Sequence, residues 1–276
     1  ARRTGDPRWA WDNVLGYFRR SERNARGADA LHGAEGPLSV SDLRHRNPLS
    51  QVFLDAASAA GLPRNPDFNG AVQEGFGYYQ VTQRNGARCS AAASFLREAS
   101  DRPNLTVRTH ATVQHLLFSG ARAIGVDYRH HGRLKRAEAG EVLLAGGALN
   151  SPQLLMQSGI GPADHLREQG IGVRHALAGV GSNLQDHYQA RTIVRLQDPV
   201  SLNNQVRSPI GLARMGWQWA FGSRGPLTVG AGQVGGFACT SQASGGRADI
   251  QFNVMPLSVD KPGTPLHDYP GFTVSV

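Results

Sequence analysis

The sequence of 276 residues is long enough for one large domain or for two smaller domains with hydrophobic cores of their own. Its 40% hydrophobic residues and 34 glycines are typical of a globular α/β protein with many tight turns, and they exclude a disordered chain. The formal net charge of +8 comes almost entirely from arginines, which are scattered along the chain, so we do not expect nucleic-acid binding.

The cysteines and the chain ends narrow the class further. Cys89 and Cys239 lie far apart without partners at metal-ligand spacing, which indicates reduced thiols in a cytoplasmic protein and argues against a zinc site or a disulfide framework. No apolar run approaches the ~20 residues of a membrane span, and the first residues lack the apolar region of a signal peptide. Because there is no initiator Met and Gly271–Val276 alternates like an interrupted strand, we expect an internal segment of a longer protein.

The first third of the chain alternates helices with short strands. Trp11–Arg20 has the apolar spacing of a short helix, and Pro37–Ser41 is a candidate strand. Asn47 followed by proline predicts a helix start, with the end of that helix at Gly61. A loop over residues 62–77, rich in glycine and proline, and a strand over 78–82 should follow.

The next part predicts an antiparallel meander. Ser90 can cap a helix that must end before Pro103. From there the apolar residues alternate with polar ones, which favours strands separated by short turns. The expected strands are a short one containing Leu105 and Val107, then Val113–Phe118, Ala123–Tyr128 and Leu134–Ala139.

A strand, a glycine turn and a helix follow the meander. Val142–Ala145 is a short apolar run that suits a strand buried on both faces of a parallel sheet, and Gly146-Gly147 must then turn the chain. Asn150 or Ser151 can cap a helix with Pro152 at its first position, and this helix should end at Ser158-Gly159. In open α/β sheets, cofactors bind at such junctions.

The last part of the chain predicts further alternating elements. A helix should contain Leu166 and end at Gly170. Arg191–Leu196 and Ile250–Val254 have the pattern of strands, while Ile210–Phe221 has the spacing of an amphipathic helix.

Several stretches carry a resemblance to one family. The segment from Gly147 to Gly161, with Asn-Ser-Pro and Ser-Gly-Ile-Gly in place, resembles the second signature of the glucose-methanol-choline (GMC) flavin oxidoreductases. The similarity is nearest to the choline dehydrogenase-like bacterial branch, and it extends over nearly the whole chain. The other matching segments are residues 65–77, 85–97, 104–118 and 179–187.

The resemblance implies a mixed α/β fold with α+β character. It implies a partial FAD-binding Rossmann-like domain with an inserted β-meander, formed by residues 1–35 and 84–187. Residues 36–83 and 188–276 would form a partial substrate domain with an antiparallel sheet. The implied activity is the FAD-dependent oxidation of a small alcohol to an aldehyde or ketone, with the protein in the cytoplasm or at the surface of the inner membrane. The alcohol, the electron acceptor and the oligomeric state are open.

The resemblance also points to cofactor-binding residues. Val113 is an ordinary β-branched strand residue by its pattern, but the corresponding valine of the family meets the adenine of FAD through its main chain. Ala145, Gly146 and Gly147 could form a purely structural turn, yet they follow a predicted strand and open a helix where the family's flavin passes. The adjoining Asn150 and Ser151 complete the expected site.

Two other motifs have simpler interpretations. Gly230, Gly232 and Gly235 form a literal G-x-G-x-x-G, but the following residues are too rich in glycine and serine to form the helix that a pyrophosphate needs, which favours a loop. Asp186-His187 could be a catalytic pair, since histidine is the usual proton acceptor near neutral pH. In the family, this segment instead crosses between domains, and the catalytic histidine lies in a later segment. We therefore expect no catalytic residue here.

Two alternatives to an enzyme stay open. The family's dinucleotide fingerprint and its catalytic histidine both have no match in these residues, so the polypeptide could by itself be a non-catalytic fragment. A polyanion-binding module driven by the charge of +8 would require steeply salt-dependent binding.

Overall fold

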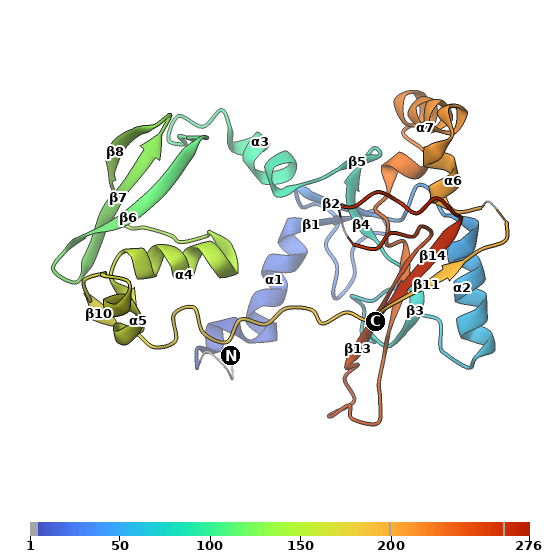
Figure 1. Ribbon diagram of the computed structural model, residues 1–276, viewed down its shortest axis with the longest axis horizontal. Helices are drawn as coiled ribbons and strands as arrows, with labels where there is room; N and C mark the ends of the chain where they lie inside the picture. The colour runs from blue at the N-terminus through green and yellow to red at the C-terminus, as the bar shows by residue number, and fades with distance from the viewer. Residues whose placement is uncertain (1–4, 199, 262) are drawn as a thin grey trace. The chain divides into compact units, whose positions relative to one another are not determined.

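The computed structural model describes residues 5–198, 200–261 and 263–276. The chain divides into two compact units (Figure 1). Unit 1 combines the residues up to Arg102 with Gln189–Val276, and unit 2 is Pro103–Tyr188. These units do not follow the boundaries expected for a FAD domain and a substrate domain, so that assignment stays a prediction.

Unit 1 is built on a five-stranded antiparallel sheet in the order β11-β14-β13-β12-β3. Strands far apart in the sequence meet in it, because β3 precedes unit 2 in the chain and the other four follow it. The antiparallel sheet expected from the sequence is thus present. Its strands are Arg191–Arg195 (β11), Gly271–Ser275 (β14), Ile250–Met255 (β13), Val234–Ala238 (β12) and Gly75–Tyr78 (β3).

A smaller sheet and several helices complete unit 1. The second sheet has the order β1-β2-β4-β5, and only its β1–β2 pair is parallel. Its strands are Glu22–Asn24 (β1), Leu38–Ser41 (β2), Val81–Arg84 (β4) and Ala87–Arg88 (β5). The helical elements are Pro7–Trp9 (η1), Trp11–Ser21 (α1), Pro48–Ala59 (α2), Ala92–Leu96 (η2), Arg97–Ala99 (α3), Leu202–Arg207 (α6), Pro209–Gly222 (α7) and Pro226–Thr228 (η3).

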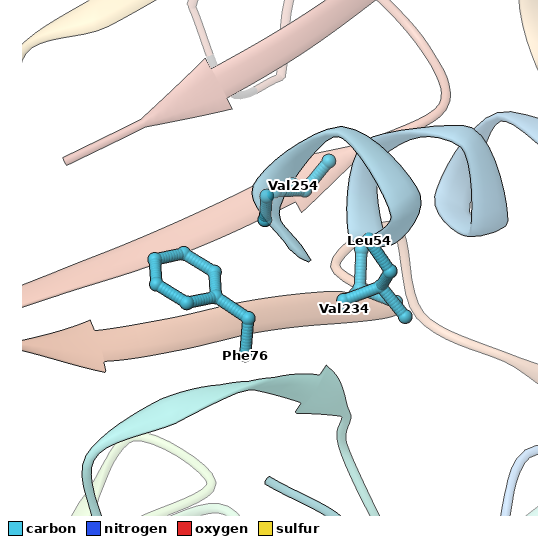
Figure 2. Packing of buried hydrophobic residues seen from close by; sticks show 5 residues of the cluster. Leu54, Phe76, Val234 and Val254 are labelled. Carbon is cyan, nitrogen blue, oxygen red and sulfur yellow. The ribbon is translucent and has the colours of Figure 1, made fainter. Parts of the chain in front are cut away.

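The core of unit 1 lies between α2 and the five-stranded sheet (Figure 2). Leu54 of α2 packs with Phe76, Val234 and Val254, which come from three neighbouring strands. Burying each such side chain contributes about 1.5–3 kcal/mol. The helix is held in place at its start, where the Asn47 side chain accepts a hydrogen bond of 3.0 Å from the Leu49 N–H, as its sequence predicted.

Unit 2 begins with the expected meander. Its three antiparallel strands are Ala111–Ser119 (β6), Arg122–His130 (β7) and Arg133–Glu138 (β8), with β7 in the middle. Helix α4 (Gly147–Gln157) lies along the sheet on the side of β6 (Figure 1). Two short strands, Ile160–Gly161 (β9) and His175–Ala176 (β10), pair in parallel. Helix α5 (Ala163–Glu168) connects them in the sequence.

Three predictions about unit 2 are wrong. Val142–Ala145 is not a strand, and Leu143 is 83% exposed, because no strand among the described residues lies beside it to pair with its backbone. Leu105 and Val107 lie in irregular chain for the same reason. Helix α4 begins at Gly147, so that Pro152 lies inside it, although its end at Ser158-Gly159 is as predicted.

Three predictions about unit 1 need correction as well. The strand expected over residues 78–82 is divided between β3 and β4. The loop expected over residues 62–77 ends earlier, because β3 begins at Gly75. The literal G-x-G-x-x-G is not entirely a loop, because Gly235 lies within β12. No helix begins at these glycines, so they lack the geometry of a pyrophosphate site. The mixed α/β fold class itself is confirmed.

Candidate functional site

A groove in unit 2 has a volume of about 750 Å³, within the usual range for ligand pockets. One wall is the beginning of β6, residues 111–114, and the opposite wall is the irregular segment 141–146. The rest of the lining comes from α4, between Asn150 and Gln157, and from residues 125, 126, 137 and 139 of the meander. The groove therefore connects the stretch around Val113 with the glycine turn, two places separated by the whole meander in the sequence.

Most of the predicted site residues meet in this groove. Val113, Ala145, Gly146, Asn150 and Ser151 all contribute to its lining. The remaining one, Gly147, is the first residue of α4 and adjoins the lining. It has a φ of +83°, a conformation that glycine adopts without strain, and a Cβ built there would meet no atom within 4 Å.

The glycine turn is fixed by a side chain of the helix that follows it. Gly146 precedes the helix and has no side chain to cap it, but its N–H donates a hydrogen bond of 2.9 Å to the Ser151 hydroxyl. The first amide groups of α4 have no partners within the helix, and they carry the positive end of its dipole. The prediction that Asn150 or Ser151 caps this helix is wrong, because both residues lie inside it, and the Ser151 hydroxyl accepts from the turn that precedes it.

All three strands of the meander contribute to the groove, β6 through residues 111–114, β7 through Gly125 and Val126, and β8 through Ala137. Among the described residues β6 is an edge strand, with β7 as its one neighbour in the sheet. Farther along β6 this edge is used, since the Leu116 N–H donates to the Ser158 hydroxyl at 2.9 Å and His115 Nδ1 lies 3.2 Å from the Gln157 carbonyl. A β-bulge between Val113 and His115 turns the strand just before these contacts. Before the bulge, residues 111–114 of β6 line the groove.

The groove is mostly neutral. Among its lining residues only Glu141 is ionisable, and the others supply small apolar side chains, hydroxyl and amide groups, and backbone. No backbone hydrogen bond within the described residues engages Val142–Ala145. Such a surface suits a flat, uncharged heterocycle with hydrogen-bonding edges, and it offers no cation to a diphosphate. The residues therefore fit the neutral parts of a dinucleotide cofactor.

The other candidate motifs do not assemble a site. The Asp186 carboxylate accepts a hydrogen bond of 2.8 Å from the main-chain N–H of His187, not from its ring, and both residues are exposed. Asp249 is the acidic residue downstream of the glycine motif. Its carboxylate accepts hydrogen bonds from the hydroxyl and the main-chain N–H of Thr240. In neither arrangement does a carboxylate orient a histidine ring.

Sequence reasoning missed one charged cluster in unit 1. The buried His32 has Glu22 3.0 Å from Nδ1 and Asp67 3.0 Å from Nε2. Burial alone would lower the pKa of His32, but the hydrogen bonds and charges of the two carboxylates outweigh it and raise the pKa above its ordinary value. These residues are separated by 10 and 35 positions in the chain, and nothing in their local sequence links them.

The cluster borders a cavity of unit 1 with a volume of about 680 Å³. The aromatic rings of Trp11, Phe18 and Phe68 contribute to the lining of this cavity.

A sequence profile of the GMC oxidoreductase family matches residues 1–189. The chain belongs to the GMC oxidoreductase family. GMC oxidoreductases and the solved structures that resemble this chain are FAD-binding flavoproteins. The resemblance inferred from the residues and the expected cofactor of the family are thereby confirmed.

Similar proteins are dehydrogenases and oxidases. The chain is 38% identical over 280 residues to an alcohol dehydrogenase [acceptor] of Pseudomonas putida, covering 99% of this chain and 50% of the relative. It is 41% identical over 258 residues to the mitochondrial choline dehydrogenase of Homo sapiens, covering 93% and 43%. The crystal structure of pyridoxine 4-oxidase from Mesorbium loti superposes with a TM-score of 0.82 at 26% identity, covering 98% and 50%. The chain thus spans about half the length of the curated relatives it matches.

The structure gives one further finding on membranes. None of the helices among the described residues has both the length and the hydropathy that crossing a bilayer requires.

Proposed function

We propose that the protein is a FAD-dependent oxidoreductase that oxidises a small alcohol to an aldehyde or ketone, in the manner of choline and alcohol dehydrogenases. The observation that carries the proposal is the groove of unit 2, which brings together residues from β6, from the glycine turn and from α4. Membership of the family supplies the reaction class, and the groove supplies a place for part of the cofactor.

Different groove residues would bind or support different parts of FAD. The open edge of β6 at Val113 would hydrogen-bond the rim of the adenine through the main chain. Ala145, Gly146 and Gly147 would let a ring system lie against the backbone, since none carries a side chain larger than a methyl group. Ser151 would keep the turn in place through Gly146, and Asn150 would add a polar side chain beside it.

When bound, FAD accepts a hydride from the carbinol carbon of the alcohol. The groove residues act by binding, by orientation and by excluding water from one face of the cofactor. No residue of this chain is assigned as the proton acceptor.

The two domains of the sequence-based assignment remain part of the proposal. Residues 1–35 and 84–187 would belong to the FAD-binding domain, and residues 36–83 and 188–276 to the substrate domain. The antiparallel sheet of unit 1, formed by strands before and after unit 2, supports a domain assembled from discontinuous segments. A location in the cytoplasm and a peripheral contact with the inner membrane are also proposed.

One observation favours the alternative that the 276-residue chain is non-catalytic by itself. Val142–Ala145 has the composition of a buried strand, yet its backbone is unpaired among the described residues and Leu143 is exposed. The groove thus has an unsupported wall. We expect the chain alone to bind FAD weakly and to oxidise no alcohol.

The test compares FAD binding by the 276-residue chain and by a longer protein from the same reading frame. Ala145→Phe would fill the groove, and Ala121→Phe, in the exposed β6–β7 turn, is the matched control. We expect the longer protein to bind FAD and oxidise choline or a simple alcohol with an artificial acceptor, and Ala145→Phe alone to weaken binding at least tenfold. Unchanged binding in Ala145→Phe would refute the groove assignment. A tight yellow complex with turnover from the 276-residue chain would refute the non-catalytic alternative.

A further inference from the structure

Helix α7 of unit 1 faces outward with its large apolar side chains. Ile210, Trp217 and Phe221 are 81%, 66% and 74% exposed. Their spacing of seven and four residues places them on one face of the helix, and the Trp217 and Phe221 rings lie 4.1 Å apart between centroids. The inward face carries Gly211, Met215 and Gln218. This helix therefore presents to solvent the side chains that a helix of a globular protein usually buries.

The charged residues in the segment of the chain that contains α7 have one sign, although Arg207 donates a hydrogen bond to the main-chain carbonyl of Asp268. Arg214 lies on the outward face, between Ile210 and Trp217 in the sequence, and no hydrogen bond or ion pair among the described residues involves its guanidinium. Arg207 precedes the helix and Arg224 follows it. The whole stretch of residues 199–248 contains no Asp or Glu. Near the end of the helix, Arg44 donates a hydrogen bond of 3.0 Å to the Ser223 carbonyl and adds another positive charge.

We propose that the outward face of α7, formed by Ile210, Arg214, Trp217 and Phe221, docks onto an anionic lipid surface. The proposal rests on the peripheral membrane contact proposed above and names the element that makes it. Aromatic and aliphatic side chains enter the boundary between headgroups and acyl chains, while arginines bind lipid phosphates from the same face. Tryptophan is enriched at this boundary.

The length of α7 supports a helix that lies on the membrane. Its 14 residues extend about 21 Å at ~1.5 Å per residue, less than the ~30 Å hydrocarbon core of a bilayer. At the outer edge of unit 1 (Figure 1), one long side of the helix is free to lie in the membrane plane.

The same charges disfavour a second copy of the chain as the occupant. A two-fold contact would bring the face onto itself, so that the Arg214 side chains of both copies would approach each other. No carboxylate in residues 199–248 could pair with them. Lipid phosphates supply the missing negative charge, and each basic side chain near such a surface strengthens binding about fivefold.

Flotation with lipid vesicles tests the proposal on the full chain. We expect binding to vesicles that contain phosphatidylglycerol, weaker binding to pure phosphatidylcholine, and a decrease with added salt. The double variant Trp217→Ser/Phe221→Ser should bind at least about tenfold more weakly, because two exposed aromatic anchors are lost. Arg214→Glu should reduce binding to the anionic vesicles only. Trp9→Ser is the matched control, since Trp9 is also 66% exposed but lies outside α7.

Several results would overturn the proposal. One is a wild-type chain that does not float, and another is a double variant that floats as well as the wild type. A third is a concentration-dependent dimer that the double variant dissociates, which would assign the face to a second copy. Far-UV circular dichroism checks that the variants are folded. FAD titration of the same samples separates this test from the proposed oxidoreductase function, because membrane binding and cofactor binding can fail independently.

Discussion

Gly235 is the most informative single position for the meaning of the glycine motif. It lies in β12 between β3 and β13, opposite Gly77 on one side and Asn253 on the other. A Cβ at this position would lie 2.0 Å from the Tyr79 hydroxyl oxygen and 2.2 Å from the Phe252 carbonyl oxygen. Both distances are far below a van der Waals contact. The structure therefore requires glycine here for strand packing.

We expect Gly235→Ala to destabilise unit 1 by about 1.5–4.5 kcal/mol. The Phe252 carbonyl belongs to a paired strand and cannot move alone, and such overpacking costs about 1–3 kcal/mol. The new methyl group would also displace the Tyr79 hydroxyl, which donates a hydrogen bond of 2.9 Å to the same carbonyl, at a further cost of about 0.5–1.5 kcal/mol. Gly230→Ala and Gly232→Ala meet no atom within 4 Å and should change stability by less than about 0.5 kcal/mol.

Urea unfolding followed by far-UV circular dichroism measures these differences as shifts of the midpoint. FAD titration of the same three substitutions in the longer protein tests the motif itself, because a true dinucleotide motif would make Gly230 and Gly232 the sensitive positions. A wild-type midpoint for Gly235→Ala, or a selective loss of FAD binding in Gly230→Ala, would show that the packing argument is mistaken.

Three other substitutions test separate parts of the molecule. Leu54→Ala should lower the free energy of unfolding by about 2–5 kcal/mol in urea, since Leu54 is 1% exposed in the core. Ser151→Ala removes the hydroxyl that accepts from the glycine turn, so FAD titration of the longer protein should show up to about tenfold weaker binding, whereas Ser182→Ala, at an exposed serine, should bind as the wild type does. His32 has a raised pKa in the folded chain, so its charge stabilises the fold at low pH, and this contribution is lost as the pH rises through the folded pKa, above the ordinary 6.5. The urea midpoint of the wild type should therefore fall over that range, and a midpoint of His32→Gln that falls equally would exclude His32 as the cause.

Local signals in the sequence predicted the elements that depend on local interactions. Asn47 and the proline after it set the start of α2 by a capping bond over two residues. The glycine and histidine turns separated the three strands of the meander, each of which pairs with its neighbour in the chain. In both cases the residues that determine the structure are close in sequence, so their pattern is sufficient.

Local sequence signals could not predict which distant segments of the chain pair with each other. The five-stranded sheet joins β3 to β12 across more than half the chain, and no periodicity within either strand specifies the partner. The contact of His32 with Asp67 has the same character, because each residue is polar and unremarkable in its own segment. The site residues could be named in advance only through the family resemblance, which carries spatial information that periodicity lacks.

The wrong prediction for Val142–Ala145 and the candidate site have one physical origin. A strand is stable only when its backbone groups find partners, and no described residue supplies them to this apolar segment. The segment therefore forms one wall of the groove while its own backbone stays free and Leu143 stays exposed. Whatever pairs with this backbone would bury Leu143 and fix the wall at the same time. Cofactor affinity and strand formation should thus be linked at this position, and the weak FAD binding expected of the isolated chain follows from that link.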